Sequence, residues 1–166
     1  MKRLLRKTKQ MTTGVFWGYL SVATKNSILK KFFLLISRFL FLRRGIEIVF
    51  NENIGSGLVL GHGRNINVNS RAVIGKNCVL FGGCTIGSVR SGPRKGVPCL
   101  GNRVVVGLNA FIGGGVHIGD DVLIAPGAFV NFDVPSHSVV IGNPGRIHAQ
   151  KIPAATIVLW QKYRQK

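Results

Sequence analysis

An isoleucine, leucine or valine recurs every six positions through most of this 166-residue chain. The series is Ile48, Ile54, Leu60 and Ile66, then Val68, Ile74, Leu80 and Ile86, then Leu100, Val106, Ile112, Ile118, Ile124 and Val130. A helix repeats at about 3.6 residues and a strand at about 2, so this period fits neither alone. It predicts short strands joined by tight turns, three to a coil of a parallel β-helix.

Small or β-branched residues usually occupy the fourth position after the aliphatic residue, as tight corners require. They are Ala72, Cys78, Cys84, Val104, Ala110, Val116, Val122 and Ala128. The third cysteine is Cys99, and no pair has C-x-x-C spacing. We therefore predict buried thiols in a reducing compartment rather than a redox or zinc site.

Positive charge dominates the first quarter of the chain. The net charge is +18, and no acidic residue precedes Glu47. Such a segment suits a polyanion, either nucleic acid or an anionic membrane. The bulky apolar run at 32–42 favours the membrane and makes nucleic acid the weaker alternative. The other alternative is a pair of helices that caps the first coil, with a solvated basic face.

The apolar run is too short to span a bilayer, and no signal-peptide cleavage site follows the basic start. We therefore expect a cytoplasmic protein, peripheral on the inner face of the membrane. Three regions follow along the chain: a basic helical leader at 1–45 with a break around 12–14, coils at 46–152, and a C-terminal helix at 153–166. A longer excursion at 88–99 interrupts the coils.

The repeats, the loop at 88–99 and the closing string at 139–147 resemble the left-handed β-helix, hexapeptide-repeat acyltransferases. The most similar branch is that of the serine acetyltransferases, especially relatives that O-acetylate sugars in capsule and exopolysaccharide synthesis. The resemblance implies a mainly β fold, a left-handed parallel β-helix. It also implies a homotrimer that binds acetyl-CoA in the groove between neighbouring solenoids.

Acetyl transfer to a hydroxyl needs a base, and histidine is the usual one near neutral pH. His62 lies at a turn between Gly61 and Gly63, where glycines let a ligand approach closely. A histidine at a turn is commonly a surface residue, but the resemblance makes His62 the catalytic base. His117, His137 and His148 are expected at the surface, and no three histidines converge, so we predict no metal.

A carboxylate on the far nitrogen would orient the base. The serine acetyltransferases place an aspartate fifteen residues before the histidine, and here that position is Glu47. Two alternatives stay open: Glu47 pairs with Arg43 or Arg44, or Glu52 supplies the acid.

Two departures from the serine acetyltransferases concern the acceptor. Their second histidine is replaced by Val97, and an acid associated with the amino acid substrate is replaced by Ser70, next to Arg71. These departures favour a sugar hydroxyl as acceptor. The first alternative is a serine O-acetyltransferase of cysteine biosynthesis. The second is a non-catalytic solenoid that binds membranes or nucleic acid, against which His62 in its glycine context counts.

The resemblance also assigns residues to acetyl-CoA. Leu108 and Pro126 would line the pantetheine groove. Asn131, followed by Phe132, stands where related sugar acetyltransferases have threonine and lysine.

At the two ends of the donor, Arg146 would bind the phosphates through its bidentate guanidinium, with Lys151 behind it. Backbone N–H groups at Gly82 and Gly83 would meet the thioester oxygen as charge develops.

Overall fold

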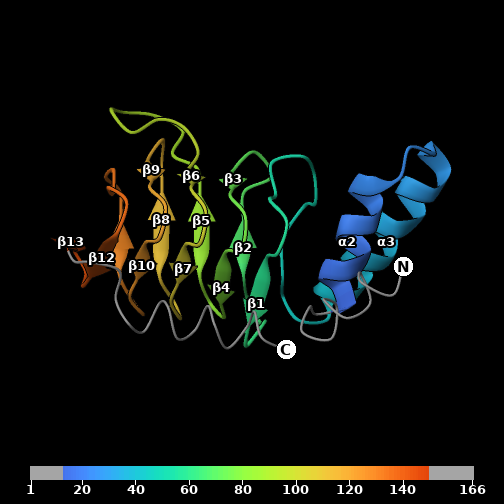
Figure 1. The fold of residues 1–166 in the computed structure, drawn as a ribbon, viewed down its shortest axis with the longest axis horizontal. Helices are drawn as coiled ribbons and strands as arrows, with labels where there is room; N and C mark the ends of the chain where they lie inside the picture. Colours follow the sequence, from blue (N-terminus) through green and yellow to red (C-terminus); the bar gives the residue numbers. More distant parts are fainter. Residues whose placement is uncertain (1–12, 150–166) are drawn as a thin grey trace.

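Residues 13–149 are described by the computed structural model, in which a helical pair precedes a stack of coils (Figure 1). The helices are α2 (Thr13–Ala23) and α3 (Ser27–Leu42). Short strands then form three flat sheets, one on each side of a triangular solenoid. The predicted parallel β-helix is confirmed.

Each sheet collects one strand from successive coils. The first contains β1 (Val59–Gly61), β4 (Val79–Phe81), β7 (Val105–Val106), β10 (Leu123–Ile124), β12 (Ser138–Ile141) and β13 (Arg146–Ala149). The second contains β2 (Asn67–Val68), β5 (Thr85–Gly87), β8 (Phe111–Gly113) and β11 (Phe129–Val130). The third contains β3 (Val73–Ile74), β6 (Cys99–Leu100) and β9 (His117–Ile118). Every pairing is parallel except β12 with β13.

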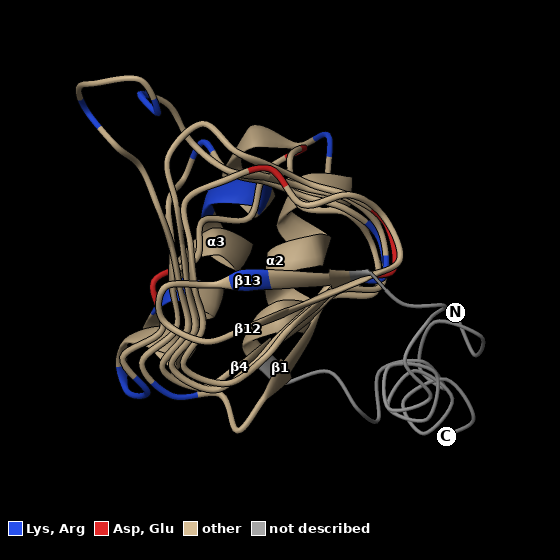
Figure 2. Ribbon diagram, turned by 90° about the vertical axis from the view of Figure 1, so that its left-hand side faces the viewer, with Lys and Arg blue, Asp and Glu red and all other residues tan. Residues whose placement is uncertain are grey.

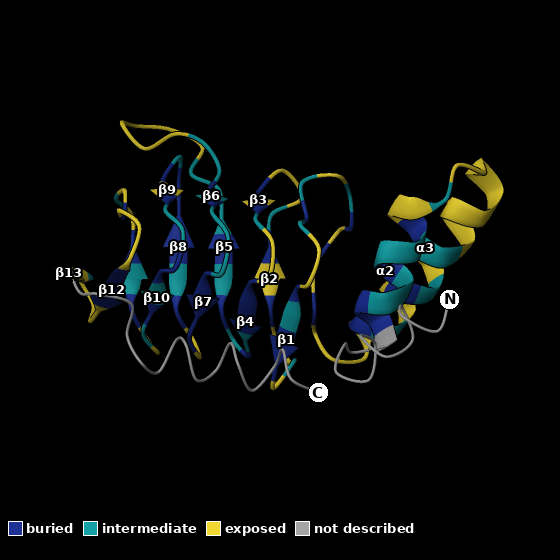
Figure 3. Cartoon of the chain, viewed as in Figure 1, coloured by how far each residue is buried: buried dark blue, intermediate teal, exposed yellow. Residues whose placement is uncertain are grey.

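The register places the six-residue series inside the solenoid. Leu60 pairs with Leu80, Leu80 with Val106, and Val106 with Ile124. These columns of aliphatic side chains form the core, which Figure 3 shows as buried positions along the coils. The predicted small positions are buried as well. Burial raises the pKa of the Cys78 and Cys84 thiols to about 12, whereas Cys99 is half-buried.

The helical pair covers the first coil. Tyr19 donates a hydrogen bond to the Gly55 carbonyl and accepts one from the Leu58 amide at 3.1 Å. Its ring meets Phe50 edge-on, and Phe50 stacks on Phe41 of α3. The predicted capping role of the leader is therefore present in the structure.

The expected break around 12–14 lies at the edge of the described residues, because α2 begins at Thr13. Gly14 lies within α2, where a Cβ atom would collide with the Phe41 ring. The two helices are joined at 24–26. The Asn26 side chain caps α3 there, accepting hydrogen bonds from the Ile28 and Leu29 amides at 2.9 and 3.2 Å.

The far end of the solenoid folds back on itself. Strand β12 continues the first sheet, and the turn at 142–145 returns the chain as β13. Lys151 and the predicted helix at 153–166 lie outside the described residues. No helix among residues 13–149 is long and apolar enough to cross a membrane.

One corner of the solenoid carries a column of polar residues. Arg103, Asp121 and His137 occupy equivalent corner positions of successive coils, each with positive φ. Arg103 binds both carboxylate oxygens of Asp121, and His137 Nδ1 lies 3.7 Å from Asp121 Oδ2. Asp121 is only 8% exposed. The hydrogen bonds from Arg103 hold the pKa of Asp121 below its usual range.

We expect Asp121→Asn to lower the free energy of unfolding at pH 7 by about 1–3 kcal/mol, because a charge-assisted pair is lost. A depressed folded pKa stabilises the protein above the unfolded value, about 3.9, and this contribution disappears as pH falls through the lower folded value. Urea unfolding across pH should therefore show a shallower acid decline for the variant. Asp133→Asn, at an exposed ion pair, is the control and should change stability less. Equal losses for both variants would contradict the prediction.

Candidate functional site

The corner between β1 and β2 is two residues longer than its equivalents. Eight positions separate Leu60 from Val68, where six separate Leu80 from Ile86. Leu60 nevertheless pairs with Leu80, and Val68 with Ile86. The two extra residues must therefore bulge outward, and His62 lies in this bulge. It has φ of 50° and an exposed side chain.

Neighbouring segments hold this bulge from both sides. On the helical side, the Asn65 amide donates to the Arg44 carbonyl at 3.0 Å. On the coil side, the Gly83 amide donates to the Arg64 carbonyl at 2.9 Å. The His62 ring also lies 6.1 Å from the Phe81 ring, centroid to centroid. The imidazole is thus open to solvent on a turn whose backbone is fixed.

His62 begins a column of corner residues that runs along the solenoid. The register places Gly82, Leu108, Pro126 and Gly142 at the equivalent position of successive coils. Leu108 and Pro126 are exposed, and the Gly127 amide donates to the Leu108 carbonyl at 2.8 Å. With neighbouring strands about 4.8 Å apart, the column extends roughly 19 Å.

The other residues predicted to bind acetyl-CoA lie in two places. Arg146 pairs with Ile141 across the final hairpin, so it lies at the far end of the column, and it is exposed. Asn131 is also exposed but follows β11, at the next corner of the coil. The structure therefore groups His62, Leu108, Pro126 and Arg146 along one edge and leaves Asn131 outside the group.

The proposed role of the Gly82 and Gly83 amides is wrong. Gly82 N–H donates to the Gly61 carbonyl at 3.0 Å, and Gly83 N–H donates to the Arg64 carbonyl at 2.9 Å. Both donors are used to hold the His62 bulge, so neither is free for a thioester oxygen. Gly82 instead matters for space, because a Cβ atom there would lie 2.7 Å from the His62 carbonyl oxygen.

Glu47 lies one coil below the bulge but does not meet His62. Its backbone pairs with Asn67, five residues beyond the histidine. Within residues 13–149, the Glu47 carboxylate has no ion pair with Arg43 or Arg44 and no hydrogen bond to His62. Glu52 is exposed and likewise makes no such contact in this range. The orienting carboxylate therefore stays a prediction.

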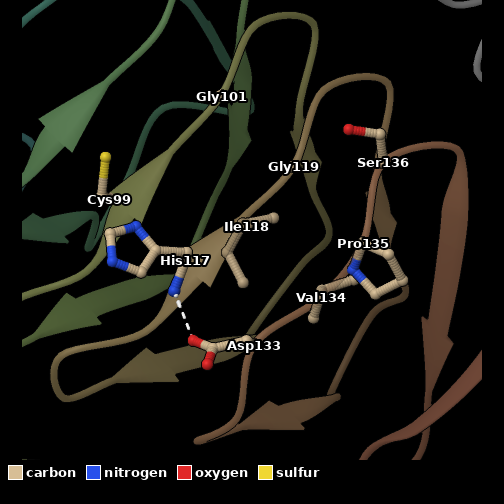
Figure 4. Close-up of a pocket in the computed structure, with 9 residues that line it drawn as sticks. All are labelled: Cys99, Gly101, His117, Ile118, Gly119, Asp133, Val134, Pro135 and Ser136. Atoms are coloured by element: carbon tan, nitrogen blue, oxygen red, sulfur yellow. Dashed lines mark hydrogen bonds between the residues drawn. The ribbon is translucent and has the colours of Figure 1, made fainter.

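A groove of about 500 Å³ lies on the third sheet, opposite the corner that carries His62 (Figure 4). Cys99 pairs with His117, and Asp133 follows in the next coil. These residues lie far apart in the sequence, and only their offsets of 18 and 16, which match coil lengths, signal that they are neighbours. The His117 amide donates to Asp133 Oδ1 at 2.8 Å, which lowers the Asp133 pKa, and Arg94 of the excursion binds Oδ2 at 3.3 Å.

This groove lacks the elements of an acyl-transfer site. Both oxygens of Asp133 are used by an amide and by Arg94, so the carboxylate does not orient the His117 ring. Across residues 13–149, no three His, Cys, Asp or Glu side chains are placed to hold a metal ion. The column headed by His62 is the stronger site, because it combines an open imidazole with an extended apolar edge.

Comparisons with known proteins point to one enzyme class. The serine acetyltransferase of Synechococcus elongatus is 36% identical over 113 residues, which are 68% of this chain and 46% of that protein. The crystal structure of Neisseria gonorrhoeae serine acetyltransferase in complex with serine matches with a TM-score of 0.56 at 30% identity, covering 68% of this chain and 48% of that one. No protein-family model matches the chain.

A serine acetyltransferase in complex with CoA matches with a TM-score of 0.65 at 20% identity, over 81% of this chain and 55% of that one, and shows the shared fold. The chain spans about half the length of these relatives. Their consistent naming overturns the predicted sugar acceptor and the capsule or exopolysaccharide branch. The departures at Val97 and Ser70 therefore do not identify a sugar acceptor.

We expect Gly82→Ala to lower the free energy of unfolding by about 1–3 kcal/mol, because the added methyl group meets rigid backbone. The His62 turn should shift with it, which the imidazole proton resonances would report. Gly87→Ala is the matched control, since its Cβ would meet nothing closer than 3.7 Å. If Gly82→Ala left the free energy of unfolding unchanged, the bulge would not be held against the second coil.

Proposed function

Because this chain has the left-handed β-helix fold of the hexapeptide-repeat acyltransferases, we propose that it transfers an acetyl group from acetyl-CoA to the hydroxyl of serine. The observation that carries the proposal is the open imidazole of His62 at the head of a column that ends at Arg146. The resemblance of both sequence and fold to serine acetyltransferases supports the choice of donor and acceptor.

The column suits an extended donor. Exposed Leu108 and Pro126 give the pantetheine arm an apolar edge between the two ends. Arg146 is free of ion pairs within the described residues and would bind phosphate oxygens. With the phosphates at Arg146, the thioester would lie near the bulge. The predicted homotrimer, in which a second solenoid would form the opposite wall, stays a prediction.

His62 would act as the general base. The imidazole takes the hydroxyl proton of serine while the oxygen attacks the thioester carbonyl carbon. The resulting tetrahedral intermediate collapses as the carbon–sulfur bond breaks. The CoA sulfur then leaves with the proton returned by the imidazolium. Exposed Arg64, two residues along the same turn, supplies a cation suited to the serine carboxylate.

The proposal is tested with the purified full-length chain, acetyl-CoA and L-serine. Release of the CoA thiol should depend on serine, and mass spectrometry should detect O-acetylserine. Serine-independent thiol release without O-acetylserine would contradict the proposed acceptor.

We expect His62→Ala to lower acetyl transfer by about 10²- to 10⁴-fold, the usual contribution of a positioned base. The side chain is exposed, so the melting temperature should not change. His117→Ala is the matched control, because it removes an exposed imidazole from a different face. Near-normal turnover of purified His62→Ala would remove His62 from the mechanism.

We expect Arg146→Ala to raise the Michaelis constant for acetyl-CoA more than it changes kcat. A phosphate contact far from the thioester stabilises the ground state and the transition state alike. Arg90→Ala, an exposed cation of the excursion, is the control. Unchanged CoA affinity in titration calorimetry would show that the final hairpin does not hold the donor.

A further inference from the structure

Helix α3 exposes a continuous apolar stripe that no described part of the chain covers. Ile28, Phe32, Leu35, Phe39 and Leu42 are each more than half exposed. Their spacing of four, three, four and three residues places them on one face of the helix. Figure 3 shows exposed segments of α3, which lies at the opposite end of the structure from β13.

The opposite face of α3 is already occupied. Phe41 and Ser37 are buried, Phe41 stacks on Phe50, and the Ser37 hydroxyl donates to the Gly14 carbonyl at 2.8 Å. The stripe therefore faces away from α2 and the coils. Covering it requires something from outside residues 13–149.

Cations border the stripe. Figure 2 shows positively charged positions on the helical pair in blue. Lys31 and Arg38 lie seven residues apart along one edge, and Arg43 follows the helix. All three are exposed and have no ion pair in the part of the chain that the structure describes. No acidic residue occurs before Glu47 to neutralise them. The partner of this surface must therefore be both apolar and negatively charged.

We propose that α3 docks on an anionic lipid bilayer, lying in the plane of the interface. Its 16 residues extend about 24 Å, which is too short to span the bilayer core. A helix with an apolar stripe and flanking cations inserts its apolar side chains among acyl chains while its charges meet anionic headgroups.

Two other occupants fit the surface less well. A second copy of the chain, stripe against stripe, would bring Lys31 and Arg38 of both copies together without a counter-charge. Nucleic acid would engage the cations but leave Phe32, Leu35 and Phe39 in water. The bilayer is the partner that satisfies both the charge and the apolar area.

Docking would also position the proposed catalytic corner. The Arg44 carbonyl just beyond α3 accepts a hydrogen bond from Asn65, three residues after His62. The end of the docked helix is therefore joined to the His62 bulge. This consequence alone rests on the proposed function, and lipid binding is measured without reference to activity.

The test is co-sedimentation of the full-length chain with phosphatidylcholine vesicles, with and without phosphatidylglycerol. The wild type should pellet only with the anionic vesicles. Added salt should weaken the binding but leave a resistant fraction, because exposed charges are screened and apolar insertion is not. Equal recovery in the supernatant with both vesicles would overturn the proposal.

Two triple variants separate the apolar contribution to lipid binding from the electrostatic one. Phe32→Ser, Leu35→Ser and Phe39→Ser together should lower the partition coefficient at least tenfold and abolish the salt-resistant fraction. Lys31→Glu, Arg38→Glu and Arg43→Glu together should lower it at least tenfold at low salt. These side chains are exposed, so both proteins should keep the wild-type melting temperature, and the charge variant serves alone if the first fails to fold.

The matched control reverses the charges of Arg71, Arg90 and Lys95, which are equally charged and are exposed outside the helical pair. It should retain binding within about twofold of wild type. Equal release by this control would mean that net charge alone binds the vesicles, and the proposal fails. Complete stripping by salt together with stronger binding to DNA would assign the surface to nucleic acid. If the wild type does not bind vesicles and the serine variant forms a smaller oligomer than the wild type, the stripe would be assigned to a second copy of the chain.

Discussion

Stacking of aliphatic side chains in register, coil upon coil, is the constraint on which the structure depends. Each column, such as Leu60, Leu80, Val106 and Ile124, is fixed by parallel backbone hydrogen bonds between successive strands. Because the strands are only two to four residues long, no strand is stable without its neighbours above and below. Irregularities can therefore be accommodated only at corners, where they leave the register intact.

Two irregularities of the coils lie at such corners. Two extra residues between Leu60 and Val68 push His62 outward, and the amides of Gly82 and Gly83 hold the bulge. The excursion at 88–99 is tied back by the Arg94–Asp133 pair, while Cys99 pairs with His117 in uninterrupted register. The solenoid remains regular, and the proposed site begins at the first of these two irregularities.

One face of the helical pair packs on the first coil, and the opposite face of α3 is exposed. Tyr19, Phe41 and Phe50 close the first coil, which would otherwise expose its core. The stripe from Ile28 to Leu42 contributes nothing to that closure. An apolar face bordered by uncompensated cations is costly in water, which is the physical reason to infer an anionic bilayer as its partner.

The sequence by itself determined the coil fold, because a six-residue aliphatic period has few other solutions, and it singled out His62 between its glycines. Only the tertiary structure aligned His62 with Leu108, Pro126 and Arg146, since that alignment depends on register across coils. It also showed that the Gly82 and Gly83 amides donate hydrogen bonds to the bulge and that the Glu47 backbone pairs with Asn67. Hydrogen-bond partners and contacts between coils are decided by the packed backbone, which periodicity alone does not specify.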